Sequence, residues 1–361
     1  MRKIINLNKN WLFSYEDTGL PSVVPENWEH IELPHTWNAV DSQDGNGSYE
    51  RGRKWYARTF YTPVQPLGKG RVYIEILAAG QQAVVYVNGK EAACHEGGYS
   101  IFRADITQLC KEKGENLLVV ACSNEHNDDI YPQTADFAFY GGLYRGVNLI
   151  SVPEAHFDLD FYGGPGMKIT PKPCENGDAV FEITSYTKNT DENFTILYSI
   201  YDAEEKEVAS ACRPAADSSV KICVPSAHKW DTEKPYLYKV TARLERRNET
   251  YDEISLHTGV RSFSCEPDKG FILNGRITPL RGVSRHQDRL YKGNALTREE
   301  QFEDAEIIKE LGANTVRLAH YQHSQDFYDA CDELGFVVWA EIPFISIMNK
   351  APAPMKTVSV N

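Results

Sequence analysis

The chain has 361 residues, which is enough for two or three domains. Its formal net charge of −13 argues against an extended basic surface, and it contains no apolar run long enough to span a bilayer, so we expect neither nucleic acid nor a membrane as a partner. The 8 cysteines show no paired short spacing, which indicates reduced thiols and argues against a zinc site or a disulfide framework.

The N-terminal decapeptide MRKIINLNKN is basic but has no continuous apolar core. It is not a signal peptide as written. The sequence therefore predicts a cytoplasmic protein, or a periplasmic or secreted one if a signal peptide had been removed before residue 1.

Residues 1–152 are rich in short alternating runs that predict β-strands. Examples are residues 72–77, residues 83–87 with the turn Asn88-Gly89 after them, and residues 117–121. Pro153 begins a second segment, 153–263, with alternating strands at 179–184, 195–200 and 238–242. Turn signals between these strands favour an immunoglobulin-like sandwich.

Residues 264–361 change pattern and read as helix-then-strand units. Residues 279–284 predict a first strand. Thr297 and Glu300 then have capping-box spacing ahead of a helix that stops at Gly312, and a second helix runs from Ser324 to Leu334 with Gly335 as its stop. The apolar runs 315–319 and 336–340 follow as strands, so three parallel strands and two helices of an α/β barrel are predicted.

Charged and ionisable residues stand at the ends of these strands, where barrel enzymes carry their chemistry. His286, His320 and Glu341 lie there, and strand alternation lets Arg317 and Glu341 share the floor of a pocket. The alternative is a structural Arg–Glu pair that closes the barrel interior.

The pattern Asn-x-x-Arg-x-x-His-Tyr at 314–321, followed by Asp332 and Gly335, resembles the signature of glycoside hydrolase family 2, the β-galactosidase and β-glucuronidase family. Residues 281–286, Arg-Gly-Val-Ser-Arg-His, resemble the first barrel strand of that family. One departure is Gln322, which stands where the family often has proline. The resemblance implies a multidomain, mainly β fold: a jelly-roll sugar-binding domain (1–152), an immunoglobulin-like sandwich (153–263), and the start of a truncated (β/α)8 barrel (264–361).

The resemblance also implies the chemistry, which is retaining hydrolysis of a β-glycoside by two glutamates. In relatives both glutamates come later than Glu341, so we expect no catalytic residue in this chain, which would then be an N-terminal portion that is inactive alone. Residues 351–361 depart from the family as well, because two closely spaced prolines resist the helix that relatives form there.

What the resemblance assigns to this chain is the supporting part of the pocket. Arg317 matches the arginine beside the nucleophile, His320 a histidine that contacts the sugar, and His286 a first-strand histidine near the same hydroxyls. Asp136, just before the segment 137–145, would accept hydrogen bonds from the sugar. Alternatively, Asp136 caps a turn, and His286 and His320 are structural histidines whose hydrogen bonds are made within the protein.

Arg285 before His286 favours a β-galactosidase with a β-galactoside substrate over a β-glucuronidase, where lysine is usual. The second hypothesis is a non-catalytic carbohydrate-binding or assembly fragment. We expect no cofactor and no metal site in this chain, and the prediction leaves open a homo-oligomer and the metal dependence of a longer parent protein.

Overall fold

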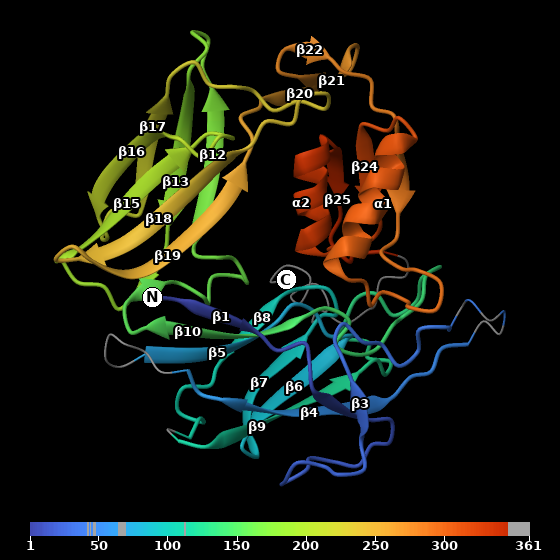
Figure 1. Cartoon of the computed structure of the whole chain (residues 1–361). Helices are drawn as coiled ribbons and strands as arrows, with labels where there is room; N and C mark the ends of the chain where they lie inside the picture. Colours follow the sequence, from blue (N-terminus) through green and yellow to red (C-terminus); the bar gives the residue numbers. More distant parts are fainter. Residues whose placement is uncertain (42, 44, 46–47, 64–69, 112, 346–361) are drawn as a thin grey trace.

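The computed structural model describes residues 1–41, 43, 45, 48–63, 70–111 and 113–345. The departure expected at residues 351–361 lies outside these ranges. Figure 1 shows two β-sandwiches and a smaller part in which helices pack on strands, and a small sheet joins that part to the second sandwich. The described structure is thus multidomain and mainly β, with the start of an α/β barrel at its C-terminal side, and it confirms the predicted fold class.

The first sandwich consists of two antiparallel sheets. The larger has the order β3-β2-β4-β9-β6-β7, from β2 (Trp11–Ser14), β3 (Glu29–Ile31), β4 (Arg53–Tyr61), β6 (Gln82–Val87), β7 (Lys90–Glu96) and β9 (Glu115–Ser123). The smaller has the order β1-β10-β5-β8, from β1 (Lys3–Asn6), β5 (Gly70–Ile76), β8 (Phe102–Asp105) and β10 (Val147–Pro153).

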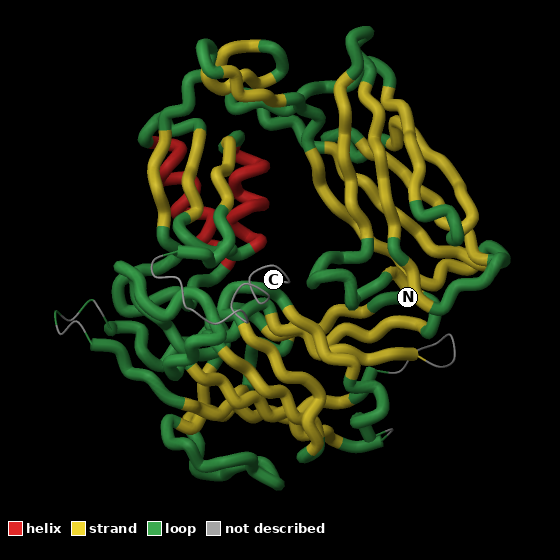
Figure 2. The backbone as a smooth tube through the Cα atoms, turned by 180° about the vertical axis from the view of Figure 1, so that it is seen from behind, coloured by secondary structure: helices red, strands yellow, loops and turns green. Residues whose placement is uncertain are grey.

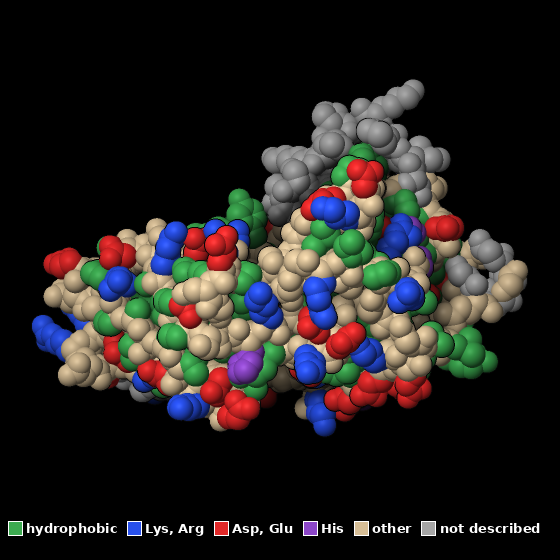
Figure 3. All heavy atoms as spheres, turned by 90° about the horizontal axis from the view of Figure 1, so that it is seen from above, with side chains coloured by type: hydrophobic (Ala, Val, Ile, Leu, Met, Phe, Trp, Pro, Cys, Tyr) green, Lys and Arg blue, Asp and Glu red, His purple; other side chains and the backbone are tan. Residues whose placement is uncertain are grey.

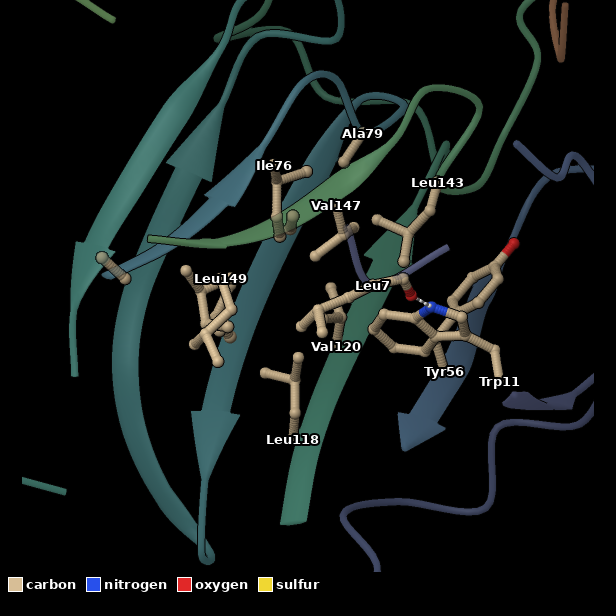
Figure 4. Close-up of a cluster of buried hydrophobic side chains, with 14 of the residues drawn as sticks. Leu7, Trp11, Tyr56, Ile76, Ala79, Leu118, Val120, Leu143, Val147 and Leu149 are labelled. Carbon is tan, nitrogen blue, oxygen red and sulfur yellow. Dashed lines mark hydrogen bonds between the residues drawn. The ribbon is translucent and has the colours of Figure 1, made fainter. Parts of the chain in front are cut away.

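The core of this sandwich explains its alternating sequence. Along β6 every second residue is buried, and the inward side chains of both sheets meet in one apolar cluster. Figure 4 shows Trp11 beside Tyr56 in this cluster, where the indole Nε1 donates to the Leu7 carbonyl at 2.6 Å. That bond satisfies the polar atom of a fully buried ring.

The second sandwich is immunoglobulin-like and has sheets of three and four strands. The first has the order β12-β13-β17, from β12 (Met167–Pro173), β13 (Ala179–Ser185) and β17 (Ser219–Val224). The second has the order β16-β15-β18-β19, from β15 (Phe194–Tyr201), β16 (Glu207–Pro214), β18 (Tyr238–Arg246) and β19 (Glu249–Thr258). A short antiparallel pair, β11 (His156–Phe157) with β14 (Thr187–Lys188), contacts β19 through β11.

A three-stranded sheet of β20 (Phe263–Glu266), β21 (Gly270–Leu273) and β22 (Arg276–Ile277) precedes the barrel part. The barrel part runs β23 (Gly282–Arg285), α1 (Arg298–Glu310), β24 (Thr315–Leu318), α2 (Gln325–Leu334) and β25 (Val337–Ala340). Its strands pair in parallel in the order β23-β24-β25. The helices lie in front of these strands in Figure 1 and behind them in Figure 2.

The helix boundaries follow from their caps. Thr297 and Glu300 form the predicted capping box of α1, and Gly312 and Gly335 adopt φ of +81° and +80° after the two helices. The first strand begins at Gly282, three residues later than predicted. Asn314 accounts for the difference, because its side chain accepts from the Arg281 amide at 2.8 Å and donates to the Pro279 carbonyl at 2.9 Å.

Contacts between the parts involve specific side chains. Arg2 pairs with the fully buried Asp252 and thereby ties the first strand to the second sandwich. Trp230 of the second sandwich donates from Nε1 to the Asp332 carbonyl of α2 at 2.8 Å. On the face in Figure 3, basic and acidic side chains are interspersed. No helix within the described ranges is long and apolar enough to cross a membrane.

Candidate functional site

The three parallel strands bring the candidate pocket residues to one edge of their sheet. Ser284, Arg317 and Trp339 are register partners across β23, β24 and β25. Their side chains therefore share one face. His286 and Glu341 follow directly at the carboxyl ends of their strands, the edge at which barrel enzymes bind their substrates.

Arg317, His320 and Glu341 form a single hydrogen-bonded cluster. Arg317 donates from Nε to Glu341 Oε1 at 2.5 Å and from Nη2 to Oε2 at 3.1 Å, and His320 Nδ1 lies 3.0 Å from Oε2. The exposed fractions of the three side chains are 41% for Arg317, 14% for His320 and 20% for Glu341. In the described part of the chain the cluster therefore faces solvent at the strand ends.

This geometry fixes the ionisation of Glu341. Partial burial alone would raise its pKa, but the hydrogen bonds and charges of Arg317 and His320 outweigh that effect and lower the pKa. Both carboxylate oxygens accept bonds as well. An acid catalyst needs a raised pKa, so Glu341 is not suited to that role.

His286 lies beside this cluster and is held by aromatic neighbours. Its Nδ1 is 3.2 Å from the Tyr321 hydroxyl, and its ring centroid is 5.2 Å from that of His320. Burial lowers the pKa of His286, and the nearby charges of Asp288 and Asp136 offset part of this decrease. The histidine is therefore neutral at physiological pH and can both donate and accept a hydrogen bond.

The segment 136–145 reaches from the first sandwich to these histidines. The ring of Phe137 lies 5.3 Å from His286, 6.1 Å from His320 and 5.3 Å from Tyr321, between centroids. Asp136, next to it, is exposed and close enough to His286 to influence its charge. The structure thus brings Asp136 to the same region as His286, His320, Arg317 and Glu341.

Close packing explains the two glycines in this segment. A Cβ on Gly141 would lie 2.0 Å from the Trp37 ring, and Gly142 has φ of +118° with its Cβ position 2.6 Å from the Tyr56 hydroxyl. Only glycine fits such positions. Arg145 then fixes the end of the segment, since it donates to the Tyr99 carbonyl at 2.9 Å and to the Gln322 carbonyl of the barrel part at 2.6 Å.

Arg285 points away from the pocket. Its guanidinium donates to Asp304 and Gln301 on α1 and stacks over the Phe327 ring on α2, 3.9 Å from the ring centroid. The residue is 6% exposed. Strand alternation places it on the helix side, opposite Arg317, so it cannot contact a sugar at the strand ends.

Sequence reasoning missed two residues of the pocket wall, Phe137 and Tyr321. Tyr321 stacks on Tyr99 of the first sandwich, with centroids 4.2 Å apart and an interplanar angle of 9°. Phe137 directly follows Asp136 and Tyr321 directly follows His320, so their position beside two predicted site residues was the signal that could have found them. Within the described ranges no group of three or more His, Cys, Asp or Glu side chains is placed to hold a metal ion.

Three family models match successive parts of the chain. The model for "Glycosyl hydrolases family 2, sugar binding domain" matches residues 4–153, "Glycosyl hydrolases family 2" matches residues 166–261, and "Glycosyl hydrolases family 2, TIM barrel domain" matches residues 267–358. All three belong to one family and occur here in sequence order.

Individual relatives agree. The crystal structure of an FMN-binding beta-glucuronidase from Facaelibacterium prausnitzii L2-6 has a TM-score of 0.94 and 58% identity, over 100% of this chain and 56% of that chain. A beta-glucuronidase of Bacteroides fragilis is 33% identical over 95% of this chain and 50% of its own length. A beta-galactosidase of Thermoanaerobacter pseudethanolicus is 31% identical over 95% of this chain and 47% of its own length.

The chain spans 41% to 50% of the length of the first three curated relatives. Over that span the three family models match in sequence order, and the backbone agrees with that of the 58% identical relative. The chain therefore belongs to the glycosyl hydrolases of family 2.

Proposed function

We propose that this chain provides the sugar-recognition side of the active site of a retaining β-glycosidase. The observation that carries the proposal is the convergence of Arg317, His320 and Glu341 with His286 at the carboxyl ends of three parallel strands. Such a group can donate to and accept from the hydroxyls of one sugar ring.

The reaction needs two carboxyl groups about 5 Å apart, one as acid and base and one as nucleophile. Neither role is assigned to this chain. Because Arg317 presents its guanidinium to a carboxylate at the pocket floor, a catalytic carboxylate placed next to it would also stay ionised. Arg317 would then act as a positioning residue for the nucleophile.

For the sugar we propose a terminal β-D-glucuronide, with a β-D-galactoside as the second candidate. The 58% identical relative is named a beta-glucuronidase, and the curated relatives carry both names. The family pattern at Arg285-His286 favours galactose, but the Arg285 side chain itself lies between α1 and α2 and does not line the strand-end pocket.

A binding experiment tests the pocket without requiring turnover. D-glucuronic acid and D-galactose are titrated separately into the chain and the heat of binding is measured. We expect saturable binding of glucuronic acid that is lost in His320→Ala and kept in His257→Ala, which changes an exposed histidine of the second sandwich.

Two results would count against parts of this proposal. Binding of galactose in preference to glucuronic acid would favour the β-galactosidase assignment. Binding that His320→Ala leaves unchanged would place the sugar outside the strand-end pocket and would contradict the proposed site.

A further inference from the structure

Tyr162 combines two unusual properties. Its side chain is 77% exposed, and its backbone has a φ of +46°. Bulky residues rarely adopt positive φ, and such conformations concentrate at functional sites. Because the ring is mostly in solvent, burial of the ring does not account for a tyrosine at this position.

Hydrogen bonds from Arg103 hold the loop that carries Tyr162. Arg103 donates from Nη1 to the Leu159 and Gly164 carbonyls, both at 2.8 Å. The same arginine pairs with Glu75 at 2.6 Å, and both side chains are under 10% exposed. A buried ion pair thus fixes the two ends of the loop 159–164.

Aromatic contacts fix the ring itself. Phe161 stacks on Tyr186 with centroids 3.9 Å apart and an interplanar angle of 17°. The ring of Tyr162 meets Phe161 edge-on, with centroids 5.1 Å apart. The ring of Tyr162 thus rests against Phe161, which is itself stacked on Tyr186, and most of it stays exposed.

This face lies at the rim of a groove of about 690 Å³ where three parts of the molecule meet. The first sandwich contributes residues between His95 and Arg103, and the loop 159–164 contributes the rim. The segment before α2 and the first turns of α2 contribute residues from Gln322 to Tyr328. Ligand sites in proteins have this size and occur preferentially where domains meet.

The groove has the chemistry of a saccharide site. Tyr162 and Tyr328 supply aromatic rings, while Ser100, Asp160 and Gln325 supply polar groups. A ring of this kind can pack against the C–H face of a sugar, and carboxylate, amide and hydroxyl groups can bond its hydroxyls.

The groove is not suited to a strongly anionic ligand. Arg103 is neutralised by Glu75, and Arg145 donates to the carbonyls of Tyr99 and Gln322. The carboxylates of Asp160 and Asp326 also line it, and they pair with Lys188 and Arg298. The charged side chains of the groove therefore already have partners, which favours a neutral ligand over a charged one.

We propose that this groove is a second carbohydrate-binding site, which holds a neutral oligosaccharide of at least two units against Tyr162. The site is separate from the strand-end pocket around His320. The inference goes beyond the proposed function and does not depend on which sugar the strand-end pocket takes.

The test uses the full chain with cellobiose and maltose as separate probes, followed by calorimetric or NMR titration. Tyr162→Asn removes the ring and is compatible with positive φ. Tyr162→Phe keeps the ring. The matched control is Tyr291→Asn, because Tyr291 is also 74% exposed with a φ of +64°.

We expect at least one disaccharide to bind saturably. Tyr162→Asn should weaken that binding about tenfold or more, which corresponds to about 1.4 kcal/mol. Tyr162→Phe, Tyr291→Asn and His320→Ala should leave it within about twofold of the unmodified chain.

Three outcomes would overturn the proposal: no saturable binding of either disaccharide, binding that survives Tyr162→Asn unchanged, or binding that depends on His320 and so belongs to the strand-end pocket. Failure of the proposed function is seen separately, as absence of monosaccharide binding that is sensitive to His320→Ala.

Discussion

Replacement of Arg317 by alanine should impair sugar binding much more than folding, and Arg285→Ala is the matched comparison. Both arginines pair with a carboxylate whose side chain is 20% exposed, but the Arg317 side chain is 41% exposed and the Arg285 side chain 6%. The two ion pairs therefore differ mainly in how far the guanidinium is removed from water.

That difference sets the expected magnitudes. Loss of a solvent-exposed pair typically changes stability by about 1 kcal/mol or less, whereas loss of one partner of a buried pair costs about 3–5 kcal/mol. Arg317→Ala should thus raise the local opening equilibrium constant of the barrel part by up to about fivefold. For Arg285→Ala the increase should exceed about a hundredfold.

Native-state hydrogen exchange of the amides of β24, which lies between β23 and β25, measures both changes. Titration with D-glucuronic acid measures the effect on the pocket, and here Arg317→Ala should abolish detectable binding. Arg317→Ala could instead lower the protection of the β24 amides from exchange as much as Arg285→Ala does and leave sugar binding intact. The Arg317–Glu341 pair would then be structural, and the reasoning would be refuted.

Three further predictions concern activity, interdomain contact and pH. The chain alone should hydrolyse neither aryl β-glucuronides nor aryl β-galactosides, and turnover comparable to that of an intact relative, with host enzyme excluded, would show that the catalytic residues were misplaced. Trp230→Phe removes the bond to Asp332, worth about 1 kcal/mol, so hydrogen exchange should quicken in α2 while the strands of the second sandwich keep their protection. Burial lowers the pKa of His35 to about 4, which means that protonation opposes folding. The free energy of unfolding of the first sandwich should therefore fall by on the order of 2 kcal/mol as pH falls from about 6.5 to about 4. If His35→Phe leaves the pH dependence of thermal unfolding unchanged, this assignment is contradicted.

Much of the fold was predictable because its signals are local. The capping box at Thr297 and Glu300 and the stops at Gly312 and Gly335 gave both helices, and their observed bounds agree with the prediction within a residue or two. Period-two alternation gave the strands for the same reason, since each buried side chain alternates with a half-buried one in β6 and with an exposed one in β17.

The pocket was predictable only in part. Alternation along a strand says that Arg317 and Glu341 can meet, and they do. It does not say which side of the sheet carries the helices, so it could not show that Arg285 packs against α1 and α2 and away from the pocket. The wall formed by Phe137 depends on a contact between segments about 150 residues apart in sequence, which no local pattern encodes.

The most direct test of the strand-end pocket is an NMR titration of the histidine ring protons with D-glucuronic acid. The account predicts that the resonances of His286 and His320 shift together and saturably, while that of the exposed His257 in the second sandwich stays in place. A saturable shift at other histidines with His286 and His320 unchanged, or no saturable shift with either D-glucuronic acid or D-galactose, would contradict it.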